Sequence, residues 1–226
     1  AMLDAVENAE LIFLAGGDQS KYVRYWKGTP LQTLLNQHVR QGKPIGGTSA
    51  GLAVLGGVAY SAMADSISAS TALKDPFSED LTLEADFLRV PLLTGIVTDS
   101  HFSERGRLGR MLAFQARGKA LRKDGPLIGM GVDESTALAI DGTGMGQVFS
   151  RSPHGRVYLS VYDASTEMIL EPGQPLSVGP VLLIGLGRES SIQFPSLEIS
   201  KPASFSFIEV TEGRIVEIDT QKQEAK

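Results

Sequence analysis

The chain has 226 residues, a formal net charge of -5 and 42% hydrophobic residues, which suffices for one buried α/β core. It has no cysteine, so disulfides, thiolate metal sites and a cysteine nucleophile are excluded. No apolar run reaches about 18 residues, no signal peptide is visible, and no basic stripe lies outside residues 105–110. We therefore expect a cytoplasmic protein with no membrane or nucleic-acid partner, folded as a single domain over residues 1–226.

The first strand signal, residues 11–15, runs into a pair of glycines followed by two polar residues. Glycines at a strand end allow a ligand to approach the backbone closely, so the Gly17 amide is a candidate oxyanion donor and Gln19 a candidate substrate contact. The alternative is a plain strand-to-helix turn in which Asp18 caps the helix.

A helix is predicted over residues 30–41, because apolar residues recur at helical spacing behind the cap-and-proline pair Thr29-Pro30. His38 lies on this helix, and we expect it at the surface or at the edge of the core.

The segment Gly47-Thr48-Ser49-Ala50-Gly51 follows a strand signal at residues 43–46 and opens a helical run at residues 50–55. This context is typical of a nucleophile elbow, in which a serine on a sharp strand-to-helix turn exposes its hydroxyl. The Ala50 amide at the helix start would point toward a developing oxyanion. The alternative is a glycine-rich connection without chemistry.

A candidate base follows the apolar run at residues 94–97. His101 comes directly after this strand signal, where loops at sheet ends carry function in α/β folds. A helix predicted over residues 104–119 places Arg107 and Arg110 on one face, and together with Arg105 they suit a carboxylate-bearing ligand. The alternatives are a packing histidine and a solvated helix face.

An acidic pair, Asp133 and Glu134, interrupts two apolar runs over residues 127–140. A carboxylate that is buried without a partner costs several kcal/mol, so one member should find a partner such as an imidazole, and we choose Glu134. The alternative is a hairpin turn with both carboxylates in solvent. The resulting order Ser49, His101, Glu134 differs from the orders of ordinary α/β-hydrolases, chymotrypsin and subtilisin, but the chemistry needs only the geometry.

The rest of the chain provides context. Residues 61–90 are expected to form an insertion or a helix near the pocket, and the α/β core to span residues 10–141. Short alternating runs at residues 156–162, 181–185 and 205–210 predict a β-rich C-terminal part over residues 145–218, before a polar tail at residues 221–226. The three histidines have no ligand spacing for zinc, and no phosphate-binding lysine motif occurs.

Taken together, the segments GGDQ, GTSAG, DSHFSERGRLGR and GMGVDESTA resemble the cyanophycinase group of serine peptidases, family S51, which is related to bacterial α-aspartyl dipeptidase. The resemblance spans residues 11–140. It implies a three-layer α/β fold whose sheet is mostly parallel, of flavodoxin-like or class I glutamine-amidotransferase-like type. It also implies a cofactor-free hydrolase of β-aspartyl bonds, as in β-aspartyl-arginine or a cyanophycin-like polymer, and it admits a homodimer.

By this resemblance the nucleophile is Ser49, the base His101 and the orienting acid Glu134, with the Gly17 and Ala50 amides as the oxyanion hole. The implied substrate-binding residues are Gln19, Asp99, Ser100, Arg107 and Arg110; no metal ligand is implied.

The sequence departs from the family pattern in two ways. Ser100 stands where cyanophycin-cleaving members carry glutamine, which leaves open an aspartyl dipeptidase with another preference. The βα units that usually precede the GGDQ strand are represented by one short helical stretch. A non-catalytic peptide-binding protein of the same fold is the rival interpretation, while an amidotransferase activity would need the cysteine that this chain lacks.

Overall fold

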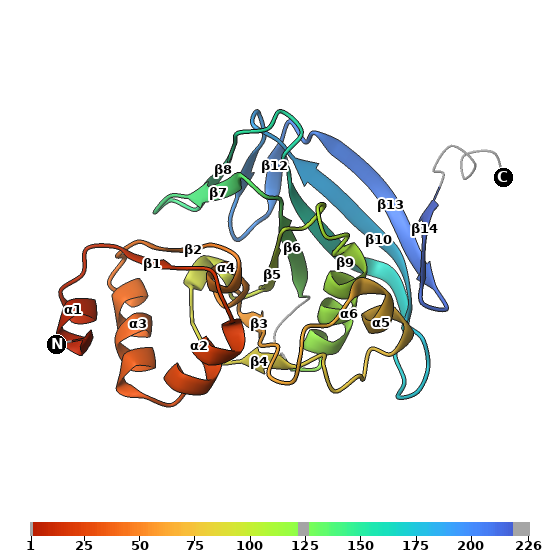
Figure 1. The fold of residues 1–226 in the computed structure, drawn as a ribbon. Coiled ribbons are helices and arrows are strands. Elements are labelled where there is room, and N and C mark those ends of the chain that lie inside the picture. The colour runs from red at the N-terminus through yellow and green to blue at the C-terminus, as the bar shows by residue number, and fades with distance from the viewer. Residues whose placement is uncertain (1, 122–126, 219–226) are drawn as a thin grey trace.

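The computed structural model describes residues 2–121 and 127–218. Its N-terminal part pairs two short parallel strands and packs helices beside them (Figure 1). The elements of this part are α1 (Met2–Glu7), β1 (Ile12–Leu14), α2 (Gln19–Trp26), α3 (Pro30–Arg40), β2 (Ile45–Gly47) and α4 (Ala50–Ala53). The helix predicted over residues 30–41 is α3, which starts at a proline as expected. His38 is buried on it, and its Nε2 donates to the Pro44 carbonyl at 2.9 Å.

An eight-stranded sheet forms the centre, in the order β14-β13-β10-β9-β6-β5-β3-β4. Its first strands in the chain are β3 (Val58–Tyr60), β4 (Leu83–Ala85), β5 (Ile96–Ser100) and β6 (Ile128–Val132). The helices between these strands are α5 (Ala69–Lys74), the 3-10 helix η1 (Pro91–Leu93) and α6 (Leu108–Lys119). The later strands of this sheet are β9 (Val157–Ile169), β10 (Ser177–Leu186), β13 (Ser204–Thr211) and β14 (Arg214–Ile218). Helices α5 and α6 pack on one face through a buried cluster that includes Leu73, Phe114 and Val181.

A second, four-stranded antiparallel sheet, in the order β12-β11-β8-β7, lies over one end of the central sheet (Figure 1). Its strands are β7 (Thr136–Ile140), β8 (Met145–Ser150), β11 (Ser191–Gln193) and β12 (Glu198–Ser200). Val148 and Ile192 of this sheet share a buried cluster with Met130 and Leu159 of the central sheet and with Leu14 of β1. The second sheet and the N-terminal part therefore cover the face opposite to α6.

The prediction of a mostly parallel sheet is wrong. Among the described strands, the parallel pairs are β1–β2, β3–β5 and β5–β6, and the other pairs are antiparallel. The β-rich C-terminal part was expected as an extension, but β9 pairs directly with β6, and β10, β13 and β14 continue the same sheet. The short connections between β9 and β10 and between β13 and β14 permit only antiparallel pairing, because a parallel pair needs a crossover of a dozen or more residues.

Two other expectations can be compared with the described elements. The runs at residues 156–162, 181–185 and 205–210 lie in or border β9, β10 and β13, as predicted. The helix expected over residues 104–119 begins only at Leu108, and the polar tail at residues 221–226 lies outside the described residues. Within residues 2–121 and 127–218, no helix is long and apolar enough to cross a membrane.

Candidate active site

Ser49 occupies the turn between β2 and α4 with φ 52° and ψ -116°, a backbone conformation that non-glycine residues rarely adopt. Such strain costs about 1–3 kcal/mol and persists only where the surroundings enforce it. A Cβ atom on Gly47 would meet the Gly51 backbone, and one on Gly51 would overlap the Leu14 carbonyl oxygen. The glycines of the motif are therefore required by close backbone contacts, as a nucleophile elbow demands.

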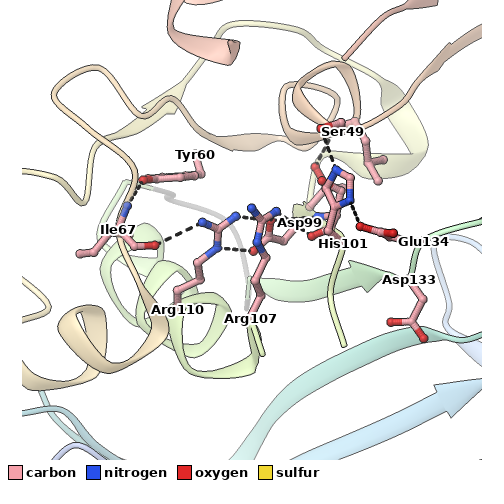
Figure 2. Close-up of polar contacts among 12 residues, drawn as sticks. Ser49, Tyr60, Ile67, Asp99, His101, Arg107, Arg110, Asp133 and Glu134 are labelled. Carbon is pink, nitrogen blue, oxygen red and sulfur yellow. Dashed lines mark hydrogen bonds and ion pairs between the residues drawn. The ribbon is translucent and has the colours of Figure 1, made fainter. Parts of the chain in front are cut away.

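The three predicted catalytic side chains lie in one hydrogen-bonded row, shown in Figure 2. His101 Nε2 lies 2.9 Å from Ser49 Oγ, and His101 Nδ1 lies 2.6 Å from Glu134 Oε1. The carboxylate can only accept, so Nδ1 carries the proton and Nε2 is free to accept from the serine hydroxyl. The arrangement can therefore transfer a proton from Ser49 to His101.

Two neighbouring parallel strands bring the base and the acid together. His101 directly follows β5 and Glu134 follows β6, and these strands pair in register up to Ser100 and Val132. Because parallel strands end at the same edge of a sheet, residues that follow them meet there. The Glu134 amide also donates to the Glu104 carboxylate at 3.0 Å, a contact that the sequence reasoning missed. The signal available was the acidic residue inside the arginine-rich segment.

The acidic pair has two different environments. Asp133 is buried and accepts hydrogen bonds from the Ser103 amide at 3.0 Å and the Arg156 amide at 2.9 Å. Figure 2 shows its carboxylate directed away from His101, whereas Glu134 points at the imidazole. Asp133 thus joins three chain segments, and Glu134 is the member in contact with the base.

The candidate oxyanion donors lie beside the serine. Gly17 and Ala50 line the same cleft as Ser49. A Cβ atom on Gly16 would come within 3.2 Å of the Ser49 Cβ, so the glycine turn closes tightly on the elbow. Asp18 caps α2 by accepting from the Ser20 amide, which confirms the capping interpretation of this segment.

The cleft has a volume of about 340 Å³ and contains every predicted substrate-binding residue. These residues are Gln19, Asp99, Ser100, Arg107 and Arg110. Residues 62–66 form part of the wall, in agreement with the expectation that residues 61–90 contribute near the pocket. Both signs of charge are therefore present around the hydroxyl of Ser49.

Arg107, Arg110 and Asp99 form an ion-pair cluster in the lining of the cleft. Arg110 is only 4% exposed and reaches both carboxylate oxygens of Asp99, at 2.7 and 2.6 Å. Its remaining terminal nitrogen donates to the Ile67 carbonyl at 3.2 Å, and its guanidinium lies 5.2 Å from the Tyr60 ring centroid. Arg110 is thus held on several sides by protein groups, which leaves it little capacity for a ligand.

Arg107 is less fully engaged, because within residues 2–121 and 127–218 only its Nη1 has partners, Asp99 Oδ1 at 3.2 Å and the Ser100 carbonyl at 2.7 Å. Burial lowers the pKa of Arg107 from its ordinary value, against the opposing effect of Asp99, and the guanidinium remains charged. Arg105 also lines the cleft, and its side chain has no ion pair or hydrogen bond among the described residues. The sequence analysis placed Arg105 in the cluster but did not select it as a site residue.

Metal ligands were not expected, and across residues 2–121 and 127–218 no group of three histidine, aspartate or glutamate side chains is placed to hold a metal ion.

Comparison with known proteins identifies the family. The family model described as peptidase family S51 matches residues 1–148. The chain belongs to peptidase family S51. This S51 chain is 30% identical over 166 residues to a cyanophycinase of Geminocystis herdmanii, covering 67% of this chain and 55% of that protein. It is 32% identical over 151 residues to a cyanophycinase of Synechococcus elongatus, covering 66% and 42%.

The chain thus spans about half the length of the curated relatives that it matches. A solved structure, the crystal structure of a peptidase from an acI-B1 Actinobacterium, superimposes with a TM-score of 0.51 at 21% sequence identity. That match covers 85% of this chain and 62% of the other, and it supports the fold alone.

Proposed function

We propose that this S51 protein is a serine hydrolase that cleaves β-aspartyl isopeptide bonds such as β-aspartyl-arginine. The observation that carries the proposal is the row Ser49–His101–Glu134, with 2.9 Å from hydroxyl to base and 2.6 Å from base to acid. Both distances lie within hydrogen-bond reach, and the strained elbow presents the hydroxyl in the cleft. Membership of family S51 supports the same reaction class.

In the acylation step, Ser49 Oγ attacks the side-chain carbonyl carbon of the β-aspartyl residue while its proton passes to His101 Nε2. Glu134 stabilises the imidazolium that forms. The Gly17 and Ala50 amides donate to the oxyanion. When the tetrahedral intermediate collapses, Nε2 gives the proton to the departing α-amine, the carbon–nitrogen bond breaks, and an aspartyl ester remains on Ser49.

In the second step, a water molecule gives a proton to His101 Nε2 and attacks the ester carbonyl. The carbon–oxygen bond to Ser49 breaks, and Nε2 returns the proton to Oγ. The products are aspartate and the freed amino acid, and the enzyme is restored. No step needs a cofactor.

Recognition of the aspartyl residue is assigned to Gln19 and to Arg107 and Arg105, whose guanidinium groups have N–H donors with no partner among the described residues. A guanidinium fork binds a carboxylate through two parallel hydrogen bonds. Arg110 and Asp99 act as positioning residues in this proposal. Asp99 accepts from Arg107, and Arg110 donates to the Ile67 carbonyl in the adjoining segment. Ser100 is short and lines the cleft, so the leaving group has room to vary.

The test combines labelling with turnover. A fluorophosphonate probe should label the parent protein and fail to label Ser49→Ala, and kcat for β-aspartyl-arginine should fall by a factor on the order of 10⁴ to 10⁶. Ser66→Ala, another serine of the cleft wall, is the matched control and should keep both labelling and turnover. Ser49→Ala retaining more than about a tenth of kcat contradicts the nucleophile assignment.

The substrate is tested by a panel of β-aspartyl-arginine, β-aspartyl-lysine, β-aspartyl-leucine and α-aspartyl dipeptides. We expect turnover of the β-linked members and little of the α-linked ones. Preference for α-aspartyl dipeptides would instead establish an aspartyl dipeptidase, and labelling without turnover of any member would contradict the substrate class. Binding without either would favour the non-catalytic interpretation.

A further inference from the structure

A second hollow lies away from the cleft and is larger, with a volume of about 540 Å³. Three connections form it: the one between β8 and β9, the one between β10 and β11, and the one between β12 and β13. None of the residues that line this pocket belongs to the family motifs, and none takes part in the reaction proposed above. The lining of the pocket includes Arg156, Gly187, Arg188, Glu189, Ser190 and Lys201.

The frame of this pocket is fixed by a buried serine. Ser190 is only 3% exposed, and its Oγ accepts from the Gly187 amide at 2.9 Å and donates to the Lys201 carbonyl at 2.6 Å. Its amide donates to the Gly187 carbonyl at 2.9 Å, which closes the turn. The connection that carries Arg188 and Glu189 and the connection that carries Lys201 are therefore tied together before any ligand binds.

The charges of the pocket are unbalanced. Arg156, Arg188 and Lys201 face one carboxylate, Glu189, and none of the four makes an ion pair among the described residues. Arg156 Nη1 donates to the carbonyls of Pro153 at 2.8 Å and Gly155 at 3.0 Å, which leaves Nε and Nη2 without partners in the described chain. In a chain of net charge -5, the described residues balance this local excess of cations with no ion pair.

Arg156 lies close to the turn at Gly187, since a Cβ atom on Gly187 would lie 3.4 Å from Arg156 Nη1, and backbone carbonyls hold the same nitrogen. A guanidinium held by backbone carbonyls has already lost much of its conformational freedom, which lowers the cost of ordering it on a ligand.

The pocket is linked directly to the catalytic row. The Arg156 amide donates to Asp133 Oδ2 at 2.9 Å, and the Asp133 amide donates to the Arg156 carbonyl at 3.1 Å. Asp133 is the neighbour of Glu134 in the chain. β6 ends, and antiparallel β9 begins, at the same edge of the central sheet, so the cleft and the pocket share that edge.

We propose that this pocket is a second substrate site that binds the arginine-type groups of neighbouring units when the substrate is a polymer. Such a group carries a carboxylate, which suits Arg156, Arg188 and Lys201, and a guanidinium, which suits Glu189. The inference rests on the proposed function, because it takes its ligand from the β-aspartyl-arginine class. It predicts that the enzyme discriminates between long and short substrates by a surface outside the cleft.

The first experiment measures binding without turnover. In the Ser49→Ala background, a fluorescein-labelled tetramer of the β-aspartyl-arginine unit is titrated by anisotropy against the parent and against Arg188→Glu/Lys201→Glu. Both side chains are exposed, so the fold is retained. We expect binding to weaken about tenfold or more, because two attractive rim contacts become repulsive. The matched control, Arg151→Glu/Arg214→Glu, makes the same charge change on exposed residues outside the pocket and should bind like the parent.

The second experiment compares kcat/KM for the tetramer and for the β-aspartyl-arginine dipeptide in the catalytically intact protein. The pocket variant should lose about tenfold on the tetramer and stay within about twofold on the dipeptide. Equal tetramer binding by pocket and control variants overturns the inference, as does an equal loss on both substrates. If the parent hydrolyses neither substrate, the proposed function fails, and the binding experiment alone decides the pocket.

Discussion

The sharpest test of the catalytic assignment replaces Glu134 by glutamine. The change removes the negative charge beside an imidazole nitrogen 2.6 Å away and keeps a side chain that can still accept a hydrogen bond. At about 4 Å between charge centres, the attraction to the imidazolium is about 4 kcal/mol at an effective dielectric constant of about 20 and about 1 kcal/mol in bulk water. Glu134 has a side chain that is 48% exposed, so an intermediate value of about 2–3 kcal/mol applies.

That free energy corresponds to a loss of about 30- to 160-fold in kcat. It is smaller than the loss of about 10⁴ that follows when a buried triad acid is neutralised, because water here shares the task of solvating the imidazolium. Stability should change little, since the same exposure means that the carboxylate contributes little to the free energy of unfolding.

Asp133→Asn is the matched control within the acidic pair. Both oxygens of Asp133 accept from backbone amides, so the new amide nitrogen must face one N–H donor and loses that hydrogen bond. We expect a cost of about 1–3 kcal/mol in the free energy of unfolding and a much smaller effect on kcat. Glu134→Gln should therefore lower kcat with little change in stability, and Asp133→Asn should lower stability with little change in kcat.

The assay is steady-state hydrolysis of β-aspartyl-arginine by the parent and both variants, with urea unfolding of each at the same pH. If Glu134→Gln loses less than about threefold in kcat, the electrostatic role is refuted. If Asp133→Asn loses turnover while Glu134→Gln keeps it, the acid of the row has been assigned to the wrong member of the pair.

Three further results are expected. Gly51→Ala should lower the free energy of unfolding by about 1–3 kcal/mol, because its Cβ overlaps the Leu14 carbonyl; urea unfolding at parental stability would refute the close contact. Arg107→Lys should raise KM for β-aspartyl-arginine about tenfold with kcat nearly unchanged, since an ammonium cannot reproduce a two-point contact, whereas an unchanged KM would remove Arg107 from substrate binding. Burial raises the pKa of Tyr162, so above pH about 10 only the unfolded chain ionises, and the free energy of unfolding falls by about 1.4 kcal/mol per pH unit. Tyr162→Phe should remove this fall, as measured by urea unfolding between pH 9 and 11. If the free energy of unfolding falls equally steeply with pH in the parent and in Tyr162→Phe, the prediction is contradicted.

Local signals in the sequence predicted elements and motifs well. The helix at residues 30–41 and the elbow at residues 47–51 both depend on neighbours in the chain, namely a proline at a helix start and glycines around a turn. Local signals gave no physical ground for preferring Glu134 over Asp133 as the partner of the imidazole. Their difference depends on contacts with Ser103 and His101, which are distant in the sequence.

The arginine cluster shows where side-chain type stops being informative. Arg107 and Arg110 were expected to act alike because they lie three residues apart. The fold gives Arg110 a buried carboxylate and a carbonyl. In the described part of the chain, two nitrogens of Arg107 and the whole guanidinium of Arg105 have no partner. Which arginine is available to a ligand is decided by the position of Asp99 at the end of β5, not by the spacing of the arginines.

The wrong prediction about the sheet does not affect the proximity of Ser49, His101 and Glu134, for a physical reason. Every parallel pair among the described strands lies in the region that carries the motifs: β1 and β2 hold the glycine turn and the elbow, and β5 and β6 hold His101 and Glu134. Because β5 and β6 are neighbouring parallel strands, their ends bring His101 and Glu134 together at one edge of the central sheet. The elbow follows the separate β1–β2 pair and places Ser49 Oγ 2.9 Å from His101 Nε2. The antiparallel strands β10, β13 and β14 extend the central sheet beyond β9, and β9 begins at this edge beside Asp133 rather than Glu134. Residue placement in the cleft therefore depends on two local strand pairs, and an error about the remaining sheet does not propagate to it.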